Sequence, residues 1–477
     1  MNLLPDLPFP KNEPEWAYKP GTPEQKELAK ALAGHETVEI PTVIGGKEYF
    51  SNDTVEVRSP HNKVKVVARI HRPTEAQHRE AIENSIKSAA EWAKLPFQSR
   101  AAVLLRTAEI LGSEFRTRIN AATMIGQSKT IDQADPDAAC ELIDFLRFNV
   151  SYAQDLYGEQ PISGPGVWNS LEYRALEGFV YAVSPFNFTA IGGNLSSAPA
   201  LMGNTVVWKP ASSSMLSAYY VMRLFEAAGL PPGVINFVPG SAGPITDTVL
   251  ASPNLAGIHF TGSTEVFNSM WKTVGANMSN YKSYPRLVGE TGGKDFIVAH
   301  PSADAAAVAV AIVRGAFEYQ GQKCSAASRA YIPKSLWPEV RDRVVAMMKD
   351  IKIGDVRDFR NFMSAVIDKK AFDKISEYIG HAKANATVIA GGGADGSKGY
   401  YIEPTLIQTD NPAYKLLCEE IFGPVITTYV YDDAKWLETL AVVDQTSPYA
   451  LTGAIFANDR RAVREGTSAL RNAAGNF

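Results

Sequence analysis

The amino-acid sequence predicts an α/β protein built on parallel sheets. From residue 179 onwards, short apolar runs alternate with longer segments in which apolar residues recur at helical spacing. Glycine and proline turns separate the two kinds of segment, and a second run of the same type begins near Phe296. Alternating strands and helices are typical of parallel sheets whose strands are joined by helical crossovers.

Length and composition restrict the class of protein. A chain of 477 residues is long enough for two or three domains. Its 45% hydrophobic and 21% charged residues are ordinary for a globular protein. The net charge of −4 gives no basic surface for nucleic acid or for an acidic membrane. No apolar run is long enough to cross a bilayer.

The cysteines and the amino terminus suggest a compartment. Cys140, Cys324 and Cys418 are odd in number and far apart, which argues against a disulfide framework and favours a reducing environment. Residues 1–14 contain acids and prolines, but neither the apolar core of a signal peptide nor an Arg-rich amphipathic helix. We therefore expect a cytoplasmic protein. The alternative is a mitochondrial matrix protein whose presequence is absent.

The first third of the chain begins with an extended arm. Residues 1–21 are rich in proline, and we expect them to lie on the body of the protein. Thr22-Pro23-Glu24-Gln25 and Thr74-Glu75-Ala76-Gln77 are capping boxes that start helices. Between them we expect strands in 38–50 and 55–70. Later helices are predicted at about 98–111, 114–125 and 137–156, the last with Cys140 as a packing residue.

The sequence pattern changes from helical to turn-rich and alternating at residues 161–178. Gly164-Pro165-Gly166 is followed by an alternating segment, which predicts a two-stranded flap that leaves the domain. Such a flap has unpaired edges, and pairing with another subunit would cover them. The next segments alternate as a parallel sheet requires, with strands at 179–183, 205–208, 234–238, 258–260 and 287–288, and helices at about 190–201, 215–228, 245–251 and 263–277.

A polar stretch, Glu318 to Ala326, holds one thiol. Inert buried cysteines normally lie among aliphatic side chains. Cys324 instead follows a glycine and Lys323, which suits a partly exposed thiol with a stabilised thiolate. A chance cysteine in a polar loop is the alternative interpretation of this stretch.

Two further motifs supply partners for such a thiol. Glu290 precedes two glycines, which leave room beside a general base for water and substrate. Asn187, in Ser184-Pro185-Phe186-Asn187-Phe188, offers an amide that can stabilise an oxyanion. A nucleophile and a base are the pair that covalent catalysis needs.

These motifs, with Glu419-Glu420-Ile421-Phe422-Gly423-Pro424, occur in an order that resembles the aldehyde dehydrogenase superfamily from about residue 40 to the end. The resemblance implies a Rossmann-type cofactor domain, an α/β catalytic domain and a small β-flap for oligomerisation. It assigns 1–37 to the arm and first helix, 38–160 and 179–288 to the NAD-binding domain, 161–178 to the flap, and 289–477 to the catalytic domain.

The resemblance also implies NAD as cofactor. Phe260-Thr261-Gly262-Ser263-Thr264 is a strand-to-helix turn whose N–H groups can hold a phosphate. From the residues alone an ordinary helix cap is the better interpretation, and it is the resemblance that implies contact with the dinucleotide. Lys209 resembles the lysine that binds the adenosine ribose, while Ser212 stands where NAD-selective members often carry glutamate. The expected cofactor residues are Ser184, Pro185, Phe186, Lys209, Ser212, Gly262, Ser263, Thr264, Glu265, Val266, Glu420 and Phe422.

Other motifs are interpreted as structural. The G-x-G-x-x-G at Gly391–Gly396 is not followed by a helical segment, so no helix end would receive a pyrophosphate. His259 is interpreted as a core histidine and Cys418 as packing. No His/Cys cluster has the spacing of metal ligands, and we expect no metal.

The implied chemistry is aldehyde oxidation through a thioester, with Cys324 as nucleophile, Glu290 as base and Asn187 as oxyanion donor. Segments 141–149, 186–194, 265–271 and 317–325 resemble the branch of the family that oxidises L-glutamate γ-semialdehyde in proline catabolism. Ser325 and Phe188 would then lie near the substrate. The family continues past the position of Phe477, so we expect the sequence to be incomplete at its carboxyl end.

Two alternatives remain open at this stage. The first is an NAD(P)-dependent aldehyde dehydrogenase with a different aldehyde, and the second is an inactive dehydrogenase-like protein with a binding role. The expected partners are a small-molecule substrate and a second copy of the chain, in a homodimer or higher homo-oligomer, and neither nucleic acid nor a membrane.

Overall fold

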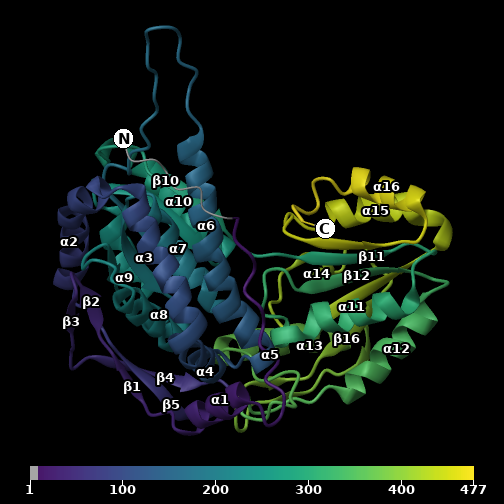
Figure 1. Cartoon of the computed structure of the whole chain (residues 1–477). Coiled ribbons are helices and arrows are strands. Elements are labelled where there is room, and N and C mark those ends of the chain that lie inside the picture. The colour runs from purple at the N-terminus through teal and green to yellow at the C-terminus, as the bar shows by residue number, and fades with distance from the viewer. Residues whose placement is uncertain (1–8, 477) are drawn as a thin grey trace. The chain divides into compact units, whose positions relative to one another are not determined.

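The computed structural model describes residues 9–476, so the part of the predicted arm that holds Pro5 and Pro8 lies outside the described residues. The chain divides into two compact units (Figure 1). The first unit comprises the residues up to 58, 65–127 and 134–291, and the second comprises 59–64, 128–133 and the residues from 292 onwards. The chain thus passes from one unit to the other after Thr291, against a predicted boundary after residue 288.

A seven-stranded sheet in the order β10-β9-β6-β7-β8-β2-β3 forms the centre of the first unit. Strands β6 to β10 pair in parallel, as the alternating sequence predicted. The hairpin of β2 and β3 is antiparallel and forms one edge. The strands are β2 (Thr42–Ile44), β3 (Lys47–Tyr49), β6 (Phe179–Ser184), β7 (Thr205–Pro210), β8 (Ile235–Phe237), β9 (Leu255–Thr261) and β10 (Arg286–Glu290).

Helices cover both faces of this sheet. One face packs apolar side chains of α2, α9 and α10 against β6, β7 and β9. The other face carries α7 and α8, over which α3, α4 and α6 pack. The helices are α1 (Pro23–Ala33), α2 (Glu75–Lys94), α3 (Phe97–Ile110), α4 (Arg116–Gln127), α5 (Ile131–Ala134), α6 (Glu141–Gly158), α7 (Thr189–Leu201), α8 (Met215–Ala227), α9 (Ala242–Leu250) and α10 (Thr264–Ala276).

Both predicted helix starts are confirmed, but only the one at Thr74 has a side-chain cap. At Thr74 the capping box is complete, with Gln77 N–H donating to Thr74 Oγ1 at 3.3 Å and Thr74 N–H donating to Gln77 Oε1 at 2.8 Å. The helix after Thr22 is also confirmed, but there the threonine hydroxyl turns back to donate to Lys19 O at 2.9 Å. Strands in the predicted 38–50 and 55–70 regions are confirmed, the longest being β4 (Thr54–Ser59) and β5 (Asn62–His71), which form a separate three-stranded sheet with β1 (Val38–Ile40).

The described part of the arm lies on the body of the first unit, as expected. Asp135 accepts hydrogen bonds from Trp16 N at 2.9 Å and from Arg116 Nε at 2.8 Å. Arg116 is fully buried and also donates to Glu13 Oε1 at 2.9 Å. Its guanidinium lies 3.1 Å from Cys140 Sγ, and burial raises the pKa of this thiol to about 12. Cys140 is therefore an unreactive packing residue, as predicted.

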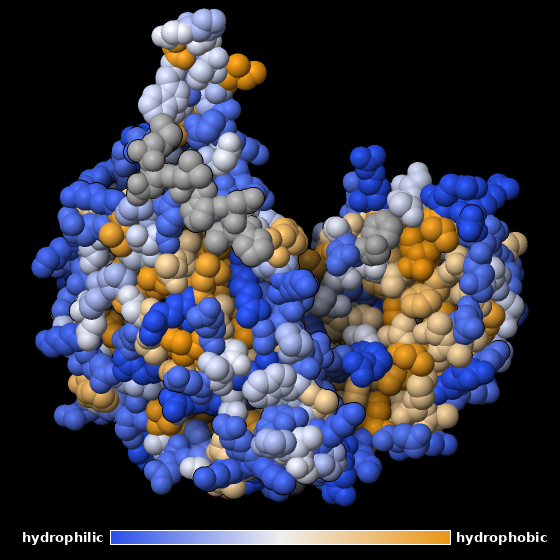
Figure 2. Space-filling view, in the orientation of Figure 1, coloured by the Kyte–Doolittle hydropathy of each residue, from blue (hydrophilic) through white to orange (hydrophobic). Residues whose placement is uncertain are grey.

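The predicted strands of the flap are wrong. Residues 159–178 leave the body as a protruding loop without strand pairing (Figure 1). Side chains bridge its two arms instead: Leu171 N–H donates to Gln160 Oε1 at 2.8 Å, and Asn169 Nδ2 donates to Ile162 O at 3.1 Å. An isolated two-stranded ribbon, with no third strand or helix to pack against, is marginal in water. Apolar side chains lie exposed on this segment (Figure 2), and Ile162 is 93% exposed.

A six-stranded sheet in the order β13-β16-β17-β12-β11-β18 forms the centre of the second unit. All neighbours are parallel except β13 and β16. Alternate residues of β11 point to opposite faces, because Ile297 and Ala299 belong to one apolar cluster while Phe296 and Val298 belong to another. The strands are β11 (Asp295–Ala299), β12 (Ala327–Pro333), β13 (Thr387–Ala390), β16 (Thr405–Thr409), β17 (Val425–Tyr431) and β18 (Gly453–Phe456).

Helices cover both faces of this sheet as well. One face buries α11 (Ala305–Phe317) and α12 (Trp337–Asp350). The other buries α13 (Lys369–Asn385), α14 (Lys415–Cys418), α15 (Trp436–Gln445) and α16 (Arg460–Ala469).

Two short segments from the first half of the chain complete the second unit. His61 Nδ1 lies 2.8 Å from Ser128 Oγ, and Tyr401 OH donates to the carbonyl of His61 at 3.0 Å. Gln133 Nε2 donates to Phe362 O at 3.0 Å. The second unit is therefore assembled from three stretches of sequence.

Candidate active site

The carboxyl ends of four parallel strands bring one group of predicted residues to a single edge of the first unit. Ser184 pairs with Pro210, Val183 with Phe260, and Thr261 with Glu290. From β6 the chain adds β7 and β8 on one side, and then β9 and β10 on the other. Such a reversal between β6 and β9 is a topological switch point, the place where open α/β sheets bind ligands.

The loop after β6 is held by buried polar side chains. Ser184 Oγ accepts from Trp208 Nε1 at 3.0 Å, and Gln127 Nε2 donates to Phe186 O at 2.6 Å. Gln127 is itself fixed, because its Oε1 accepts from Ser217 and Thr189 hydroxyls at 2.8 and 3.1 Å. Asn187 follows in this loop and is 3% exposed.

The turn after β9 opens helix α10, as the sequence predicted. Ser263 Oγ accepts from Val266 N–H at 3.4 Å and so caps the helix. Gly262 N–H donates to the backbone carbonyl of Glu290 at 3.2 Å, which ties the turn to the end of β10. The remaining N–H groups of a helix amino terminus favour an anion.

Glu290 ends β10 and is exposed. The residue before it, Gly289, lies under the ring of Phe267, and a Cβ at Gly289 would lie 2.3 Å from that ring. Phe267 stacks on Phe260 with ring centroids 5.3 Å apart. The absence of a side chain at Gly289 therefore lets the end of β10 pack under the aromatic pair of Phe267 and Phe260.

Lys209 is the last residue but one of β7 and is 6% exposed. Burial lowers the pKa of its ammonium to about 8. Within residues 9–476 we find no hydrogen bond or ion pair to its Nζ, whereas nearby Ser212 is exposed and donates from its hydroxyl to Gly240 O at 3.1 Å. A buried amine without a partner is costly, and a polar ligand group would relieve that cost.

In the second unit, the amino ends of parallel strands gather the other predicted residues. Asp295 at the start of β11 pairs with Ala327 at the start of β12. β17, which begins at Val425, is the other neighbour of β12. The segments before these three strands carry Gly293, Cys324 and Glu420, so all three reach the same edge of one sheet.

Gly293 lies between the thiol loop and Glu420. Its N–H donates to Glu420 Oε1 at 2.9 Å. A Cβ at Gly293 would lie 1.9 Å from the carbonyl oxygen of Cys324, and one at Gly292 would lie 2.4 Å from Glu420 Oε1. Both glycines are therefore required by close packing, and the room that the sequence suggested beside them is occupied by Glu420 and the cysteine loop.

The backbone before Cys324 is strained. Tyr319, Gln320 and Gly321 have φ values of 48°, 55° and 64°, three successive residues in the left-handed region. For a non-glycine residue this conformation costs about 1–2 kcal/mol. At Gly321 a Cβ would lie 2.2 Å from Gly423 O, so that position accepts no side chain. Cys324 is half-buried after this turn.

Two residues predicted near the substrate or cofactor also flank these loops. Ser325 is exposed, and Phe422, next to Glu420, has φ 62°. In the first unit, half-buried Phe188 immediately precedes α7.

A buried ionisable cluster below the cysteine loop was missed from the sequence. Lys294 is 1% exposed, donates to Ser328 Oγ at 2.6 Å, and has a pKa lowered to about 7 by burial and by Arg329. Burial raises the pKa of Asp295 to about 7, while its Oδ1 accepts from Thr452 N at 2.9 Å. Burial also raises the pKa of Glu420. The available signal was the pair Lys294-Asp295 directly before an apolar strand.

The residues interpreted as structural are placed as expected. His259 Nδ1 lies 3.1 Å from Leu195 O, and burial lowers the pKa of its ring. After β13, the segment Gly391–Gly396 contains the short strand β14 (Ala394–Asp395), and the next element is another strand, β15 (Tyr401–Ile402), and not a helix. Cys418 is half-buried at the end of α14.

Two features are absent from residues 9–476. No group of three or more His, Cys, Asp or Glu side chains is arranged to hold a metal ion. None of the helices described combines the length and the apolarity that crossing a membrane requires.

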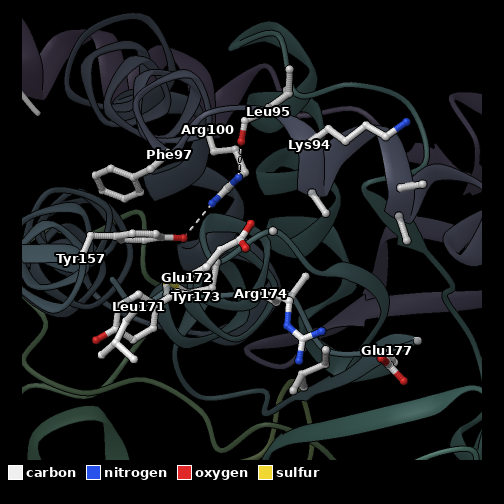
Figure 3. Close-up of a pocket in the computed structure, with 18 residues that line it drawn as sticks. Lys94, Leu95, Phe97, Arg100, Tyr157, Leu171, Glu172, Tyr173, Arg174 and Glu177 are labelled. Atoms are coloured by element: carbon white, nitrogen blue, oxygen red, sulfur yellow. Dashed lines mark hydrogen bonds between the residues drawn. The ribbon is translucent and has the colours of Figure 1, made fainter. Parts of the chain in front are cut away.

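A groove lies at the base of the protruding loop (Figure 3). It has a volume of about 650 Å³ and is lined by α2, α3 and the loop itself. Arg100 lies along its wall and donates to Tyr157 OH at 3.0 Å. None of the predicted catalytic or cofactor residues lines it.

The first unit has a topological switch point of the kind that binds dinucleotides, and the second has a strained cysteine loop, which together indicate an α/β oxidoreductase. The model of the Aldehyde dehydrogenase family matches residues 49–476, and this chain belongs to that family. The predicted α/β fold of aldehyde dehydrogenases is confirmed.

Individual relatives are similar over almost the whole chain. The mitochondrial delta-1-pyrroline-5-carboxylate dehydrogenase of Dictyostelium discoideum is 51% identical over 481 residues, which covers 99% of this chain and 86% of that protein. The human mitochondrial enzyme of the same name is 48% identical over 471 residues, covering 98% and 84%. The crystal structure of the Mycobacterium tuberculosis delta-pyrroline-5-carboxylate dehydrogenase bound with NAD has 48% identity and a TM-score of 0.96, covering 100% of this chain and 89% of that one.

Proposed function

We propose that this chain oxidises L-glutamate γ-semialdehyde, which derives from Δ1-pyrroline-5-carboxylate, to L-glutamate with NAD, the second step of proline catabolism. The observation that carries the proposal is the 48–51% identity, over nearly the full chain, to delta-1-pyrroline-5-carboxylate dehydrogenases. The aligned lengths span both strand edges. The substrate and the reaction class follow from the relatives, and the roles of individual residues follow from their chemistry.

Cys324 is the proposed nucleophile. Its thiolate attacks the aldehyde carbon, a C–S bond forms, and the carbonyl oxygen becomes an oxyanion to which the Asn187 amide and the Cys324 N–H donate. NAD, when bound, accepts the hydride that leaves this carbon, and a thioester on Cys324 remains. Glu290 then takes a proton from water, the resulting hydroxide attacks the thioester, the C–S bond breaks, and the thiolate and glutamate separate.

The first unit provides the proposed phosphate and ribose contacts. The capped amino end of α10 offers N–H groups to the diphosphate, and Lys209 offers a buried amine without a partner within residues 9–476 to the adenosine ribose. Ser212 carries no charge that would repel a 2′-phosphate, so NADP is the competitor to measure. The proposed set in this unit is Ser184, Pro185, Phe186, Lys209, Ser212, Gly262, Ser263, Thr264, Glu265 and Val266.

In the second unit, Glu420 is proposed to bind the nicotinamide ribose and Phe422 to border the nicotinamide ring. The Gly293 N–H and close packing against Gly292 fix the Glu420 carboxylate in one orientation. A carboxylate held in this way can accept hydrogen bonds from two ribose hydroxyls. Ser325, exposed beside Cys324, and Phe188 in the first unit are proposed to contact the substrate.

The chain is further proposed to act as a homodimer or higher homo-oligomer. The protruding loop supports this, because its exposed apolar side chains, such as Ile162, have no cover within the described part of the chain. The proposed compartment is the cytoplasm, with the mitochondrial matrix as the alternative. The names of the Dictyostelium discoideum and human relatives contain the word "mitochondrial".

The test is NADH formation by the full chain with Δ1-pyrroline-5-carboxylate and, separately, with propanal. We expect strong preference for the first substrate and a loss on the order of 10⁴-fold or more in kcat for Cys324→Ser. Equal or reversed preference would still support an aldehyde dehydrogenase, but it would exclude L-glutamate γ-semialdehyde as the preferred substrate. Protein that binds NAD but forms no NADH from either aldehyde would support the binding-protein alternative.

Glu290→Gln separates the two half-reactions. The variant should form one equivalent of NADH per active site and then stop, because the thioester is no longer hydrolysed. Intact mass spectrometry should show the acyl group on Cys324. Rapid multiple turnover in this variant would exclude Glu290 as the base.

A further inference from the structure

The left-handed turn at Tyr319, Gln320 and Gly321 requires stabilising contacts, because its backbone conformation is strained. It begins two residues after the end of α11 and ends three residues before Cys324, so any relaxation of the turn moves the thiol. Gly321 adopts its φ of 64° without strain, because it has no Cβ. Tyr319 and Gln320, at φ 48° and 55°, are strained. Strain of this kind persists only where surrounding contacts fix it.

The side chain of Gln320 provides such contacts. It is fully buried, and its amide makes three hydrogen bonds to backbone groups. Nε2 donates to Ser128 O at 3.2 Å and to Ala365 O at 2.8 Å, and Oε1 accepts from Ser364 N–H at 3.0 Å. One side chain therefore joins the turn to two distant segments of the same unit.

Neighbouring contacts act on the same turn. Tyr319 is fully buried, and Lys129 Nζ lies 4.3 Å from the centre of its ring. Gln322 Oε1 accepts from Ile367 N–H at 2.8 Å. Thus residues on both sides of Gly321 are attached to the segments 128–129 and 364–367, and the turn cannot move independently of them.

We propose that Gln320 is a positioning residue for Cys324: its buried amide fixes the left-handed turn and thereby the orientation of the thiol. This inference rests on the proposed function in that the thiol is taken as the nucleophile. Gln320 itself has no contact with solvent, and its three hydrogen bonds all go to backbone groups outside the cysteine loop. Its effect is expected on the chemical step, and not on the binding of NAD.

The principal test is Gln320→Met in the full chain. Methionine keeps the length and the shape of the side chain but loses all three hydrogen bonds. We expect kcat with Δ1-pyrroline-5-carboxylate to fall about 100-fold, the loss typical of a misplaced reacting group. The dissociation constant for NAD, followed by fluorescence, should stay within twofold. The pH dependence of Cys324 alkylation by iodoacetamide should also change.

Gln133→Met is the matched control. Gln133 is 1% exposed, lies in the same unit, and uses its amide in a similar way, accepting from Thr130 N–H at 3.0 Å and donating to Phe362 O at 3.0 Å. Its bonds do not reach the cysteine loop. We expect a comparable fall in Tm but wild-type kcat and a wild-type alkylation profile. A fall in kcat equal to that of Gln320→Met would overturn the proposal.

Gln320→Asn is a second variant that keeps the proposal testable if Gln320→Met does not fold. Asparagine tolerates positive φ better than most residues, but its side chain is one methylene too short to reach all three partners. We expect folded protein with reduced kcat and altered alkylation. Wild-type kcat and alkylation in this folded variant would reject Gln320 as a positioning residue. Because alkylation reports on the thiol without any aldehyde, the result is independent of whether the proposed substrate is correct.

Discussion

The two strand edges present their functional groups by different means. In the first unit, the groups lie where regular strands end and a helix begins, and capping and strand register position them. In the second unit, the groups lie in loops before the strands, where positive φ values and close glycine contacts replace regular geometry. At the first edge the turn after β9 follows local capping rules and only the loop after β6 relies on distant side chains such as Gln127. The second edge depends throughout on buried contacts between distant segments.

This difference indicates what each edge can tolerate. A capped helix end loses about one hydrogen bond when its cap is removed, and the helix itself persists. The cysteine loop has no regular structure to return to, so one added carbon atom can displace it. Substitutions that test both edges should therefore differ in size as well as in the function they affect.

The largest effect is expected for Gly321→Ala. The new Cβ would meet Gly423 O at 2.2 Å and would also force alanine to φ 64°. We expect a loss of about 2–4 kcal/mol in the free energy of unfolding, together with loss of activity. Urea unfolding and NADH formation measure the two.

Gly229→Ala is the control for backbone conformation. Gly229 has φ 88° but nothing within 4 Å of its Cβ position, so only the conformational cost, about 1 kcal/mol, remains. Equal losses at the two glycines would show that the packing of the cysteine loop contributes nothing.

An intermediate effect is expected for Asp295→Asn. Burial raises the pKa of Asp295 to about 7, so the folded protein retains a proton that the unfolded chain releases from about pH 4. This group therefore lowers the free energy of unfolding as the pH rises from about 4 to about 7. Asparagine removes the penalty and can still accept from Thr452 N–H.

The gain in stability from Asp295→Asn over wild type should thus grow as the pH rises and level off above about pH 7. Urea unfolding at pH 5, 6, 7 and 8 measures it. Exposed Asp304→Asn, which keeps an acceptor at the cap of α11, is the control. A gain that is constant across this range would contradict the raised pKa.

The smallest effect is expected at the first edge, for Ser263→Ala. Loss of the hydrogen bond from Val266 N–H should cost about 1 kcal/mol of stability. NAD should bind about three- to tenfold more weakly. Thr74→Ala removes a comparable hydroxyl cap from α2 and should cost similar stability while NAD affinity is unchanged. Equal NAD affinity in both variants would show that the turn after β9 does not contribute to NAD binding.

The sequence was informative where structure is local. Alternating segments predicted the strands and helices of both units, and Thr74 and Ser263 were recognisable as helix starts because caps act within four residues. The flap strands were wrong because the alternating pattern at 161–178 cannot show that no third strand covers them. Gln320 carried no signal, since its partners Ser128 and Ala365 are 192 and 45 residues away. Lys294 and Asp295 were missed because burial of charges depends on the same long-range packing.

The assembly of the second unit from three stretches bears on modular engineering. A fragment from residue 292 onwards would lack 59–64 and 128–133, and with them the carbonyls of His61 and Ser128 that accept from Tyr401 and Gln320. No single cut in the chain releases the cysteine-bearing unit whole. Exchange of this unit between relatives as a contiguous cassette should therefore fail unless those two short inserts travel with it.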